Sequence, residues 1–293
     1  MKQLCVISGK GGTGKTTVAA SLAALAPAPA ALADCDVDAS NLPLILGACG
    51  RSRRPFEAGL VAWIDPQRCT GCQRCIELCR FDAIVCEGSG CQVDTLRCEG
   101  CKVCSIFCSP EAIVMRPVEC GEIFVSETVH GPLTHARLRP GRENSGKLVS
   151  AVRDEALIQA RSRDAPIILI DGSPGIGCPV IATLSGVDLA LLVTEPTPSG
   201  TQGLDRVLRV AEHFGVPAVA CVNRSDLCAE RVTEIESLCE SRGVPLLGRI
   251  PFDRSVVEAM VALRPAVGSA SEAVQTELRS LAEAVFDRLL DGH

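Results

Sequence analysis

The sequence predicts an α/β protein whose mostly parallel sheet is flanked by helices and interrupted by a small α+β module rich in cysteine. Three observations support this fold class. Short apolar runs recur between helical patterns, a glycine-rich loop at 9–17 follows the first run, and two cysteine runs with the same spacing occupy the middle of the chain. Buried strands that alternate with helices are typical of βαβ units on a sheet covered on both faces.

The expected strands are the short apolar runs at 4–7, 30–33, 167–170, 190–193, 218–222 and 246–250. The expected helices follow turns after these runs, and they lie at 15–25, 146–162, 200–214, 227–242, 254–263 and 271–290. Between 118 and 139 apolar and polar residues alternate in places, which predicts a hairpin that rejoins the sheet.

The alternation of strands and helices stops between about residues 55 and 117, where eight cysteines form two runs. The runs are Cys69-x-x-Cys72-x-x-Cys75-x-x-x-Cys79 and Cys98-x-x-Cys101-x-x-Cys104-x-x-x-Cys108. The second run begins 98 − 69 = 29 residues after the first, and each is followed by Ala-Ile-Val after a further three residues. We therefore expect a duplicated module at 59–117, inserted between a first part at 1–58 and a second part at 118–293 of one α/β domain.

Composition excludes several classes of protein. A formal net charge of -6 over 293 residues does not suit the clustered basic footprint of a nucleic-acid-binding protein. No apolar stretch reaches the ~20 residues that a membrane-spanning helix needs. Residues 1–4 lead directly into the first expected strand, so we expect no secretory leader. The cysteines therefore indicate metal ligands in a reducing compartment, the cytoplasm, and eight of the 18 lie in the two runs.

The glycine-rich loop, GKGGTGKTT at 9–17, is expected to bind the phosphates of ATP. A loop between a strand and a helix directs successive backbone N–H groups at a phosphate, and the helix dipole adds to this. Lys15 would reach the β- and γ-phosphates, and Thr16 would bind Mg²⁺. The expected phosphate-binding residues are Gly11, Gly12, Thr13, Gly14, Lys15, Thr16 and Thr17.

A second lysine in this loop, Lys10, makes the motif resemble the deviant Walker A loop of the MinD/ParA superfamily of P-loop ATPases, in the SIMIBI class. That group also includes the nitrogenase iron protein. Further segments are similar to those of the family and occur in family order: a first switch at 34–42, a Walker B strand with the second switch at 167–175, and base-recognition segments at 221–226 and 250–254. The similarity covers nearly all of the chain outside 55–145.

This resemblance implies roles for particular residues. Asp36 would orient the attacking water and Asp171 would hold the Mg²⁺ shell, while Asn223 and Pro251 would contact the base. Lys10 would contact the nucleotide of a partner protomer, which implies an ATP-bound homodimer or a pair of paralogues. A solvated loop lysine is the alternative for Lys10.

Each cysteine run has the spacing that holds a [4Fe–4S] cluster in bacterial two-cluster ferredoxins, where the fourth cysteine of each run binds the other cluster. The expected ligand sets are Cys69, Cys72, Cys75 and Cys108 for the first cluster, and Cys98, Cys101, Cys104 and Cys79 for the second. Two zinc sites are the alternative, but a third cysteine at the same step in both runs favours iron–sulfur. Arg80 replaces the usual proline after the first run. Cys86 and Cys91, between the runs, are expected to be free thiols.

Cys178 follows Asp171 by seven residues, where the resemblance to the nitrogenase iron protein places a ligand of a cluster that bridges two protomers. The segment at 141–147, where the second such ligand would be expected, has no cysteine. Cys178 therefore has two interpretations: a thiol with no metal role, or a metal contact across a dimer axis.

These features predict a slow, partner-coupled ATPase that uses two [4Fe–4S] clusters for nucleotide-gated electron transfer to a protein partner. An ATP-dependent factor that assembles or carries an iron–sulfur or other metal cluster is the second hypothesis. A spatial organiser of the MinD or ParA kind is the third, and the acidic chain and the absence of a basic surface helix argue against it.

Overall fold

The computed structural model describes residues 1–87, 90–141 and 145–291, and the chain divides into two compact units. The first unit comprises Met1–Arg54, Ile123–Arg137 and Ser145–His293, and the second comprises Pro55–Glu122 and Leu138–Asn144. Two long strands, β3 (Cys49–Ile64) and β6 (Ile113–Thr128), contribute residues to both units.

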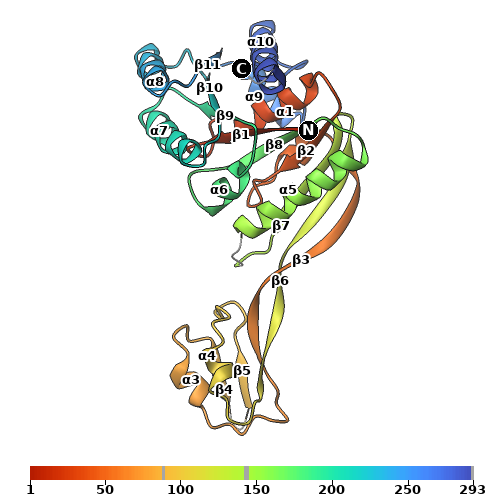
Figure 1. Ribbon diagram of the computed structural model, residues 1–293, viewed down its shortest axis with the longest axis vertical. Coiled ribbons are helices and arrows are strands. Elements are labelled where there is room, and N and C mark those ends of the chain that lie inside the picture. Colours follow the sequence, from red (N-terminus) through yellow and green to blue (C-terminus); the bar gives the residue numbers. More distant parts are fainter. Residues whose placement is uncertain (88–89, 142–144, 292–293) are drawn as a thin grey trace. The chain divides into compact units, whose positions relative to one another are not determined.

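A nine-stranded sheet forms the framework of the first unit, with the order β11-β10-β9-β1-β8-β2-β7-β6-β3 (Figure 1). The neighbouring strands from β11 to β7 all pair in parallel. Besides β3 and β6, the strands are β1 (Lys2–Ser8), β2 (Ala30–Asp34), β7 (Gly131–Leu138), β8 (Ile167–Pro174), β9 (Leu189–Thr194), β10 (Ala218–Asn223) and β11 (Leu246–Ile250). All six predicted strands are present, and β7 joins the sheet beside β2 after a short turn from β6, which confirms the predicted hairpin.

Helices cover both faces of this sheet. The helices of the first unit include α1 (Lys15–Leu25), α5 (Ser145–Ser162), α6 (Cys178–Leu184), α7 (Pro198–His213), α8 (Ala229–Ser241), α9 (Arg254–Val261) and α10 (Glu272–Asp291). On one face Leu4 and Val6 of β1 share a buried cluster with α1 and α10. On the other, α5, α6 and α7 lie against the central strands, with Thr183 of α6 close to Ile7. Burial on both faces explains why these strands are continuous apolar runs.

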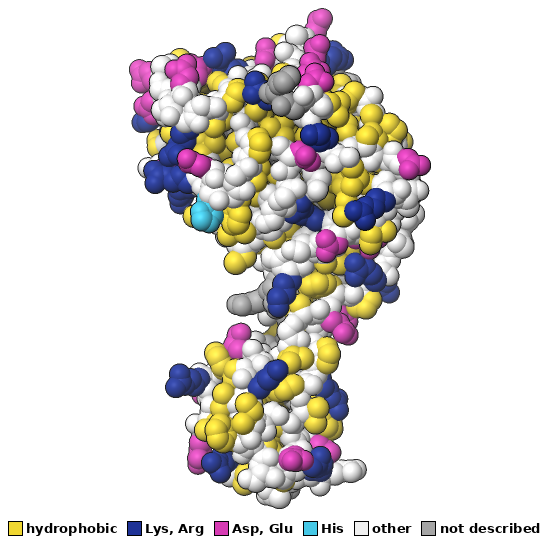
Figure 2. Space-filling view, in the orientation of Figure 1, with side chains coloured by type: hydrophobic (Ala, Val, Ile, Leu, Met, Phe, Trp, Pro, Cys, Tyr) yellow, Lys and Arg dark blue, Asp and Glu magenta, His cyan; other side chains and the backbone are white. Residues whose placement is uncertain are grey.

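The sequence located the long helices to within three residues at each end, but it did not predict two short helices of the first unit, α2 (Leu42–Ile45) and α6. Both have a proline near the start and are too short to show a helical period. None of the helices in the described part of the chain combines the length and apolar character needed to cross a membrane. On the face of the molecule in Figure 2, Lys and Arg side chains lie interspersed with Asp and Glu.

The second unit contains the ends of β3 and β6, a hairpin of β4 (Ile84–Glu87) and β5 (Gly90–Val93), and two short helices, α3 (Arg74–Leu78) and α4 (Val103–Ile106). Its apolar core is small. The buried members are Ala62, Ile64, Ile84, Cys91 and Ile113. Six cysteines of the two runs pack against this core, so the thiols supply much of its interior.

The 29-residue repeat is visible in the backbone of the second unit. Gly71 and Gly100 have φ angles of 68° and 65°, and Gln73 and Lys102 have φ angles of 61° and 68°. Two equivalent hydrogen bonds join opposite ends of the repeats: Asp65 N–H donates to the Ala112 carbonyl at 2.8 Å, and Asp94 N–H donates to the Ala83 carbonyl at 2.8 Å. The start of each repeat is therefore fastened to the end of the other.

Candidate functional sites

A cleft of about 670 Å³ lies in the first unit, where the parallel strands end at their carboxyl termini. Its lining includes Gly11, Gly12, Gly14, Lys15, Thr16, Thr17, Asp36, Asn223 and Pro251, all of them predicted site residues. Gly12 and Gly14 have φ angles of 80° and 92°, which other residues rarely adopt, and Gly14 begins helix α1. The glycines therefore turn the chain so that the N-terminus of α1 faces the cleft.

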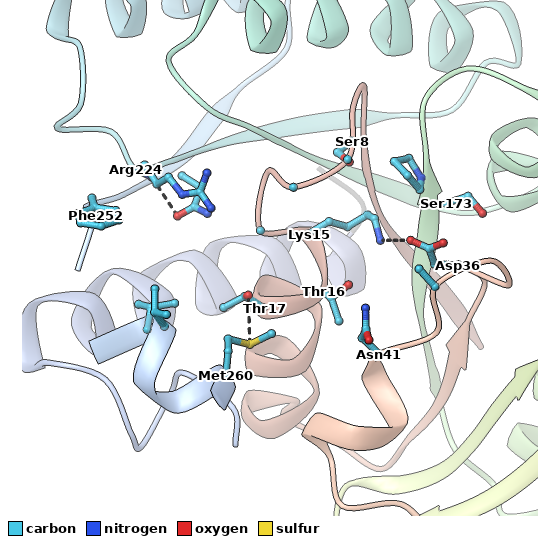
Figure 3. Close-up of a pocket in the computed structure, with 18 of the residues that line it drawn as sticks. Ser8, Lys15, Thr16, Thr17, Asp36, Asn41, Ser173, Arg224, Phe252 and Met260 are labelled. Carbon is cyan, nitrogen blue, oxygen red and sulfur yellow. Dashed lines mark hydrogen bonds and ion pairs between the residues drawn. The ribbon is translucent and has the colours of Figure 1, made fainter. Parts of the chain in front are cut away.

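Lys15 is the charged centre of the cleft, and its side chain is almost buried. Its Nζ lies 2.9 Å from Asp171 Oδ1. Figure 3 shows its second ion pair, in which Nζ lies 3.6 Å from Asp36 Oδ2. Burial alone would lower the pKa of Lys15, but the two carboxylates outweigh burial and raise it above its ordinary value. The ammonium group therefore stays charged beside the phosphate-binding loop.

Asp34 is a third carboxylate next to this pair, and its place in the site was not predicted. It is buried at the end of β2 and accepts hydrogen bonds from Asp36 N–H at 3.1 Å, Ser40 Oγ–H at 2.8 Å and Leu42 N–H at 3.1 Å. Burial, followed by repulsion from Asp171, raises the pKa of Asp34 to about 7. Asp34 thus organises the turn that presents Asp36 to the cleft.

Asp171 carries an oxygen that suits a metal ion. Its Oδ1 accepts from Lys15, while Oδ2 is buried and has no hydrogen-bond partner within the described part of the chain. A buried carboxylate oxygen without a partner is costly unless a cation or a water satisfies it. Thr16 lines the cleft together with Lys15, which contacts Asp171, and the two oxygen donors fit Mg²⁺, which prefers one or two protein oxygens together with phosphate.

At the opposite side of the cleft, Asn223 ties the end of β10 to the phosphate-binding loop. Its Nδ2 donates to the Thr13 carbonyl at 2.8 Å, and a Cβ placed on Gly14 would meet that nitrogen at 2.2 Å. Pro251 and the half-exposed Phe252 line the cleft beside it. The segments predicted for base recognition therefore lie together at one end of the cleft.

Lys10 is placed differently from Lys15. Lys10 is not one of the described residues that line the cleft. Its Nζ contacts Glu195 Oε1 at 2.5 Å, and Glu195 also binds Arg224 at 2.6 Å. Sequence reasoning missed both Glu195 and Arg224, because only the fold brings them next to the loop.

In the second unit the eight run cysteines line two cavities. Cys69, Cys72, Cys75 and Cys108 line one, and Cys79, Cys98, Cys101 and Cys104 line the other. Cys91 and Cys104 also border the first cavity. Each cavity therefore receives three cysteines of one run and the fourth of the other, which is the grouping that the sequence predicts.

Burial disfavours ionisation of two of the thiols in these cavities. Burial, followed by repulsion from Cys98 and Cys101, raises the pKa of Cys104 to about 11, and burial also raises the pKa of Cys75. Backbone N–H groups of Ala62 and Ala83 donate to the sulfurs of Cys98 and Cys79, each at 3.4 Å. Such donors stabilise thiolate sulfur, and a bound metal would displace the thiol protons.

Cys86 and Cys91 are not free thiols, so that prediction is wrong. They face each other across the β4–β5 hairpin with their Cα atoms 3.9 Å apart, and they form a disulfide. Their sulfurs also lie within 4.8 Å of the Cys75 sulfur. As a disulfide the pair is unavailable as metal ligands, which leaves the eight run cysteines as the candidate set.

Cys178 is exposed and is the first residue of α6. A Cβ added to Gly146 would meet the Cys178 Cβ at 3.2 Å, so this end of α6 lies close to the start of α5. The second bridging ligand would be expected in the segment at 141–147. Residues 142–144 of that segment lie outside the described residues. The role of Cys178 stays a prediction.

The fold and the cleft define a nucleotide-binding protein of the P-loop class. A glycine-rich loop connects β1 to α1, and Lys15 at the start of α1 contacts the strand-end carboxylate of Asp171. Comparison with known families then assigns it: the chain belongs to the CobQ/CobB/MinD/ParA nucleotide-binding domain family, whose model matches residues 4–265. The predicted membership of the MinD/ParA superfamily is thereby confirmed.

Two relatives come from Methanocaldococcus jannaschii, and both are described as uncharacterized proteins. One is 33% identical over 236 residues, covering 77% of this chain and 79% of its own. The other is 28% identical over 271 residues, covering 88% of each chain.

Solved structures agree with the fold. The cell division ATPase MinD of Pyrococcus furiosus matches with a TM-score of 0.59 and 22% identity over 98% of both chains. MinD of Pyrococcus horikoshii, solved with Mg-ADP, matches with a TM-score of 0.60 and 21% identity over 97% of this chain and 95% of its own. At this identity the likeness establishes the fold.

Proposed function

We propose that the protein binds and hydrolyses Mg-ATP in the cleft of the first unit and that this reaction gates electron transfer through two [4Fe–4S] clusters in the second unit to a protein partner. The observation that carries the proposal is the presence, in one chain, of a lysine–carboxylate phosphate site and of two cavities that each include three cysteines of one run and the fourth of the other. Neither site alone accounts for the other.

In the cleft each residue has a distinct task. The loop N–H groups and Lys15 bind the phosphates, and Lys15 stabilises the charge that develops as the γ-phosphate leaves. Asp36, whose carboxylate lies 3.6 Å from the Lys15 ammonium, would orient water toward that phosphate. Thr16 and Asp171 would hold Mg²⁺, which would neutralise phosphate charge when bound. Asn223 and Pro251 would position the base.

Hydrolysis is proposed to require a second protomer, either a copy of this chain or a paralogue. The resemblance to the MinD/ParA superfamily implies that Lys10 of each protomer contacts the nucleotide bound by its partner. Closure on ATP and reopening after hydrolysis would move the second units relative to their partner.

In the second unit Cys69, Cys72, Cys75 and Cys108 would hold one cluster, and Cys98, Cys101, Cys104 and Cys79 the other. Bound clusters would supply one-electron transfer at low potential. The protein contributes the thiols, the N–H groups directed at sulfur and an apolar core that limits water around them.

One observation favours the second hypothesis, a cluster assembly or carrier factor. Cys178 is exposed in the segment that follows Asp171, so a thiol lies next to the proposed Mg²⁺ ligand strand and is open to a client. A carrier would hold a labile cluster there, whereas the electron-transfer protein would keep all of its iron in the second unit.

Anaerobic purification with iron and sulfide analysis tests the proposal. We expect about eight iron and eight sulfide per chain, ATP hydrolysis that is lost without Mg²⁺, and no transfer of iron to an apo-ferredoxin during turnover. ATP-dependent transfer that is abolished by Cys178→Ser would instead support the carrier. A protein with two zinc ions and no sulfide would overturn the iron–sulfur assignment.

A further inference from the structure

A disulfide lies beside one of the two cysteine cavities of the second unit. It joins Cys86 of β4 to Cys91 of β5, and helix α3, which carries Cys75, packs beside β4 (Figure 1). The sulfurs of Cys75, Cys86 and Cys91 all lie within 4.8 Å of one another. Because Cys75 is an expected ligand of the first cluster, the disulfide is next to a group that would bind a one-electron carrier.

The disulfide also borders the cavity of the first expected cluster. Cys91 is buried and is part of the lining of that cavity. Cys104, an expected ligand of the second cluster, lines the same cavity. Electrons from either expected cluster would therefore reach the disulfide across one cavity.

A role in stability alone accounts poorly for this pair. A disulfide stabilises mainly by restricting the unfolded chain, and it does so less when it closes a short loop. Cys86 and Cys91 are five positions apart, and they are already opposite each other in the register of the β4–β5 hairpin. Among the described residues the other sixteen cysteines are free, so the oxidised pair lies beside the cavity where electron carriers are expected.

We propose that the Cys86–Cys91 disulfide is a redox-active site that takes two electrons from the expected clusters and passes them to a disulfide of a partner molecule. This inference rests on the proposed function, which supplies the clusters, and they are charged by a low-potential one-electron donor. Cleavage of a disulfide to two thiols needs two electrons and two protons. Each cluster carries one electron, so the two clusters of one chain supply both electrons, and solvent supplies the protons.

The difference in exposure between the two sulfurs sets the order of the exchange reaction. Cys86 is half-buried, whereas Cys91 is buried. In the reduced pair the Cys86 thiolate attacks the substrate disulfide, which forms a mixed disulfide and releases one substrate thiol. The Cys91 thiolate then attacks the Cys86 sulfur, which re-forms the original disulfide and releases the second substrate thiol. Two further electrons and two protons return the pair to the dithiol.

The thiol state of the cluster-loaded parent protein tests the first step. After iron and sulfide analysis, the protein is reduced with reduced methyl viologen, freed of the dye anaerobically and quenched in acid with N-ethylmaleimide. Against the same protein left unreduced, we expect about two additional modified thiols per chain, located by mass spectrometry at Cys86 and Cys91. The electron paramagnetic resonance signal of the reduced clusters should disappear as these thiols form.

Two variants and a small disulfide test the remaining steps. Cys86→Ser removes the acceptor, so its clusters should stay reduced after the dye is removed, whereas Cys49→Ser, an exposed free thiol of the first unit, should behave as the parent. The reduced parent should cleave hydroxyethyl disulfide at least about tenfold faster than Cys86→Ser. If Cys86→Ser does not fold, the thiol state of the parent still decides the first step.

The outcomes separate this inference from the proposed function. An intact disulfide after reduction of a parent protein that holds both clusters would overturn the inference and leave the proposed function standing. Two new thiols that do not cleave hydroxyethyl disulfide would overturn the exchange step. A parent protein without iron and sulfide would overturn the proposed function and this inference together.

Discussion

The two candidate sites are built in opposite ways. The nucleotide cleft gathers residues that lie far apart in the sequence, such as Lys15, Asp171 and Asn223, at the ends of parallel strands. The cysteine cavities are made by two adjacent copies of one 29-residue pattern. The first lies on a large apolar core, whereas the apolar cluster in the described part of the second has five buried residues and is completed largely by cysteines.

This contrast teaches that the two ligands have different relations to folding. A cleft supported by a complete sheet is preformed, and nucleotide binding adds to its stability by mass action. A small core lined with thiols resembles the metal-dependent modules in which binding free energy is folding free energy. The predictions below test this difference, from the largest expected effect to the smallest.

Removal of iron should unfold the second unit and spare the first. After anaerobic chelation, we expect amide hydrogen exchange in residues 59–117 to accelerate about 100-fold or more, because the core alone is too small to hold the fold. Exchange in β1, β8 and β9 should stay slow. Equal protection of 59–117 with and without iron would show that the disulfide of Cys86 and Cys91 and the apolar core suffice.

Lys15→Ala should impair the reaction in the first unit and leave the second unit unchanged. Loss of the ammonium that lies 2.9 Å from Asp171 should lower ATP hydrolysis by about 100-fold or more, as for removal of one transition-state donor. Iron content should not change, and Lys147→Ala on the surface of α5 serves as the matched control. Phosphate release at the parental rate would show that Lys15 takes no part in the reaction.

The crossed ligand sets make a prediction about paired substitutions. Cys79→Ala with Cys98→Ala removes two ligands of the same expected cluster, so about four of eight iron should remain. Cys79→Ala with Cys69→Ala damages both clusters and should leave almost none. Iron analysis of the anaerobic proteins distinguishes the arrangements, because ligation within each run would reverse the two results.

Asn223→Ala should have the smallest effect. The substitution removes the hydrogen bond to the Thr13 carbonyl, which is worth about 1 kcal/mol, so we expect ATP affinity to fall about fivefold. Isothermal titration calorimetry measures this, with Gln159→Ala on α5 as the control. An affinity equal to that of the parent would mean that Gly14 and its neighbours hold the loop without Asn223.

The sequence predicted most of the framework because its signals are local. Six strands, the long helices and the phosphate-binding loop follow from apolar runs and from glycine spacing, and the family assignment confirms the fold they imply. The 16-residue strand β3 was not predicted, since its first half carries arginines and is mostly exposed, so no buried face marks it.

What the sequence could not predict depends on contacts between distant elements. In the sequence Glu195 is one acidic residue after an expected strand, and only the fold brings it into contact with Lys10 and Arg224. Asp34 was assigned to the switch segment, but its hydrogen bonds to Ser40 and the Leu42 backbone emerge only from the folded turn. The pairing of Cys86 with Cys91 follows from the register of a short hairpin that no sequence period reveals.

The central claim is that the nucleotide state of the cleft controls the clusters. Its most direct test is stopped-flow measurement of cluster reoxidation by a one-electron acceptor dye, after reduction with dithionite and mixing with Mg-ATP or Mg-ADP. We predict faster reoxidation with Mg-ATP in the parent and equal rates in Lys15→Ala, because only a protein that binds and hydrolyses ATP can couple the two sites. Equal rates with Mg-ATP and Mg-ADP in the parent protein would contradict the account.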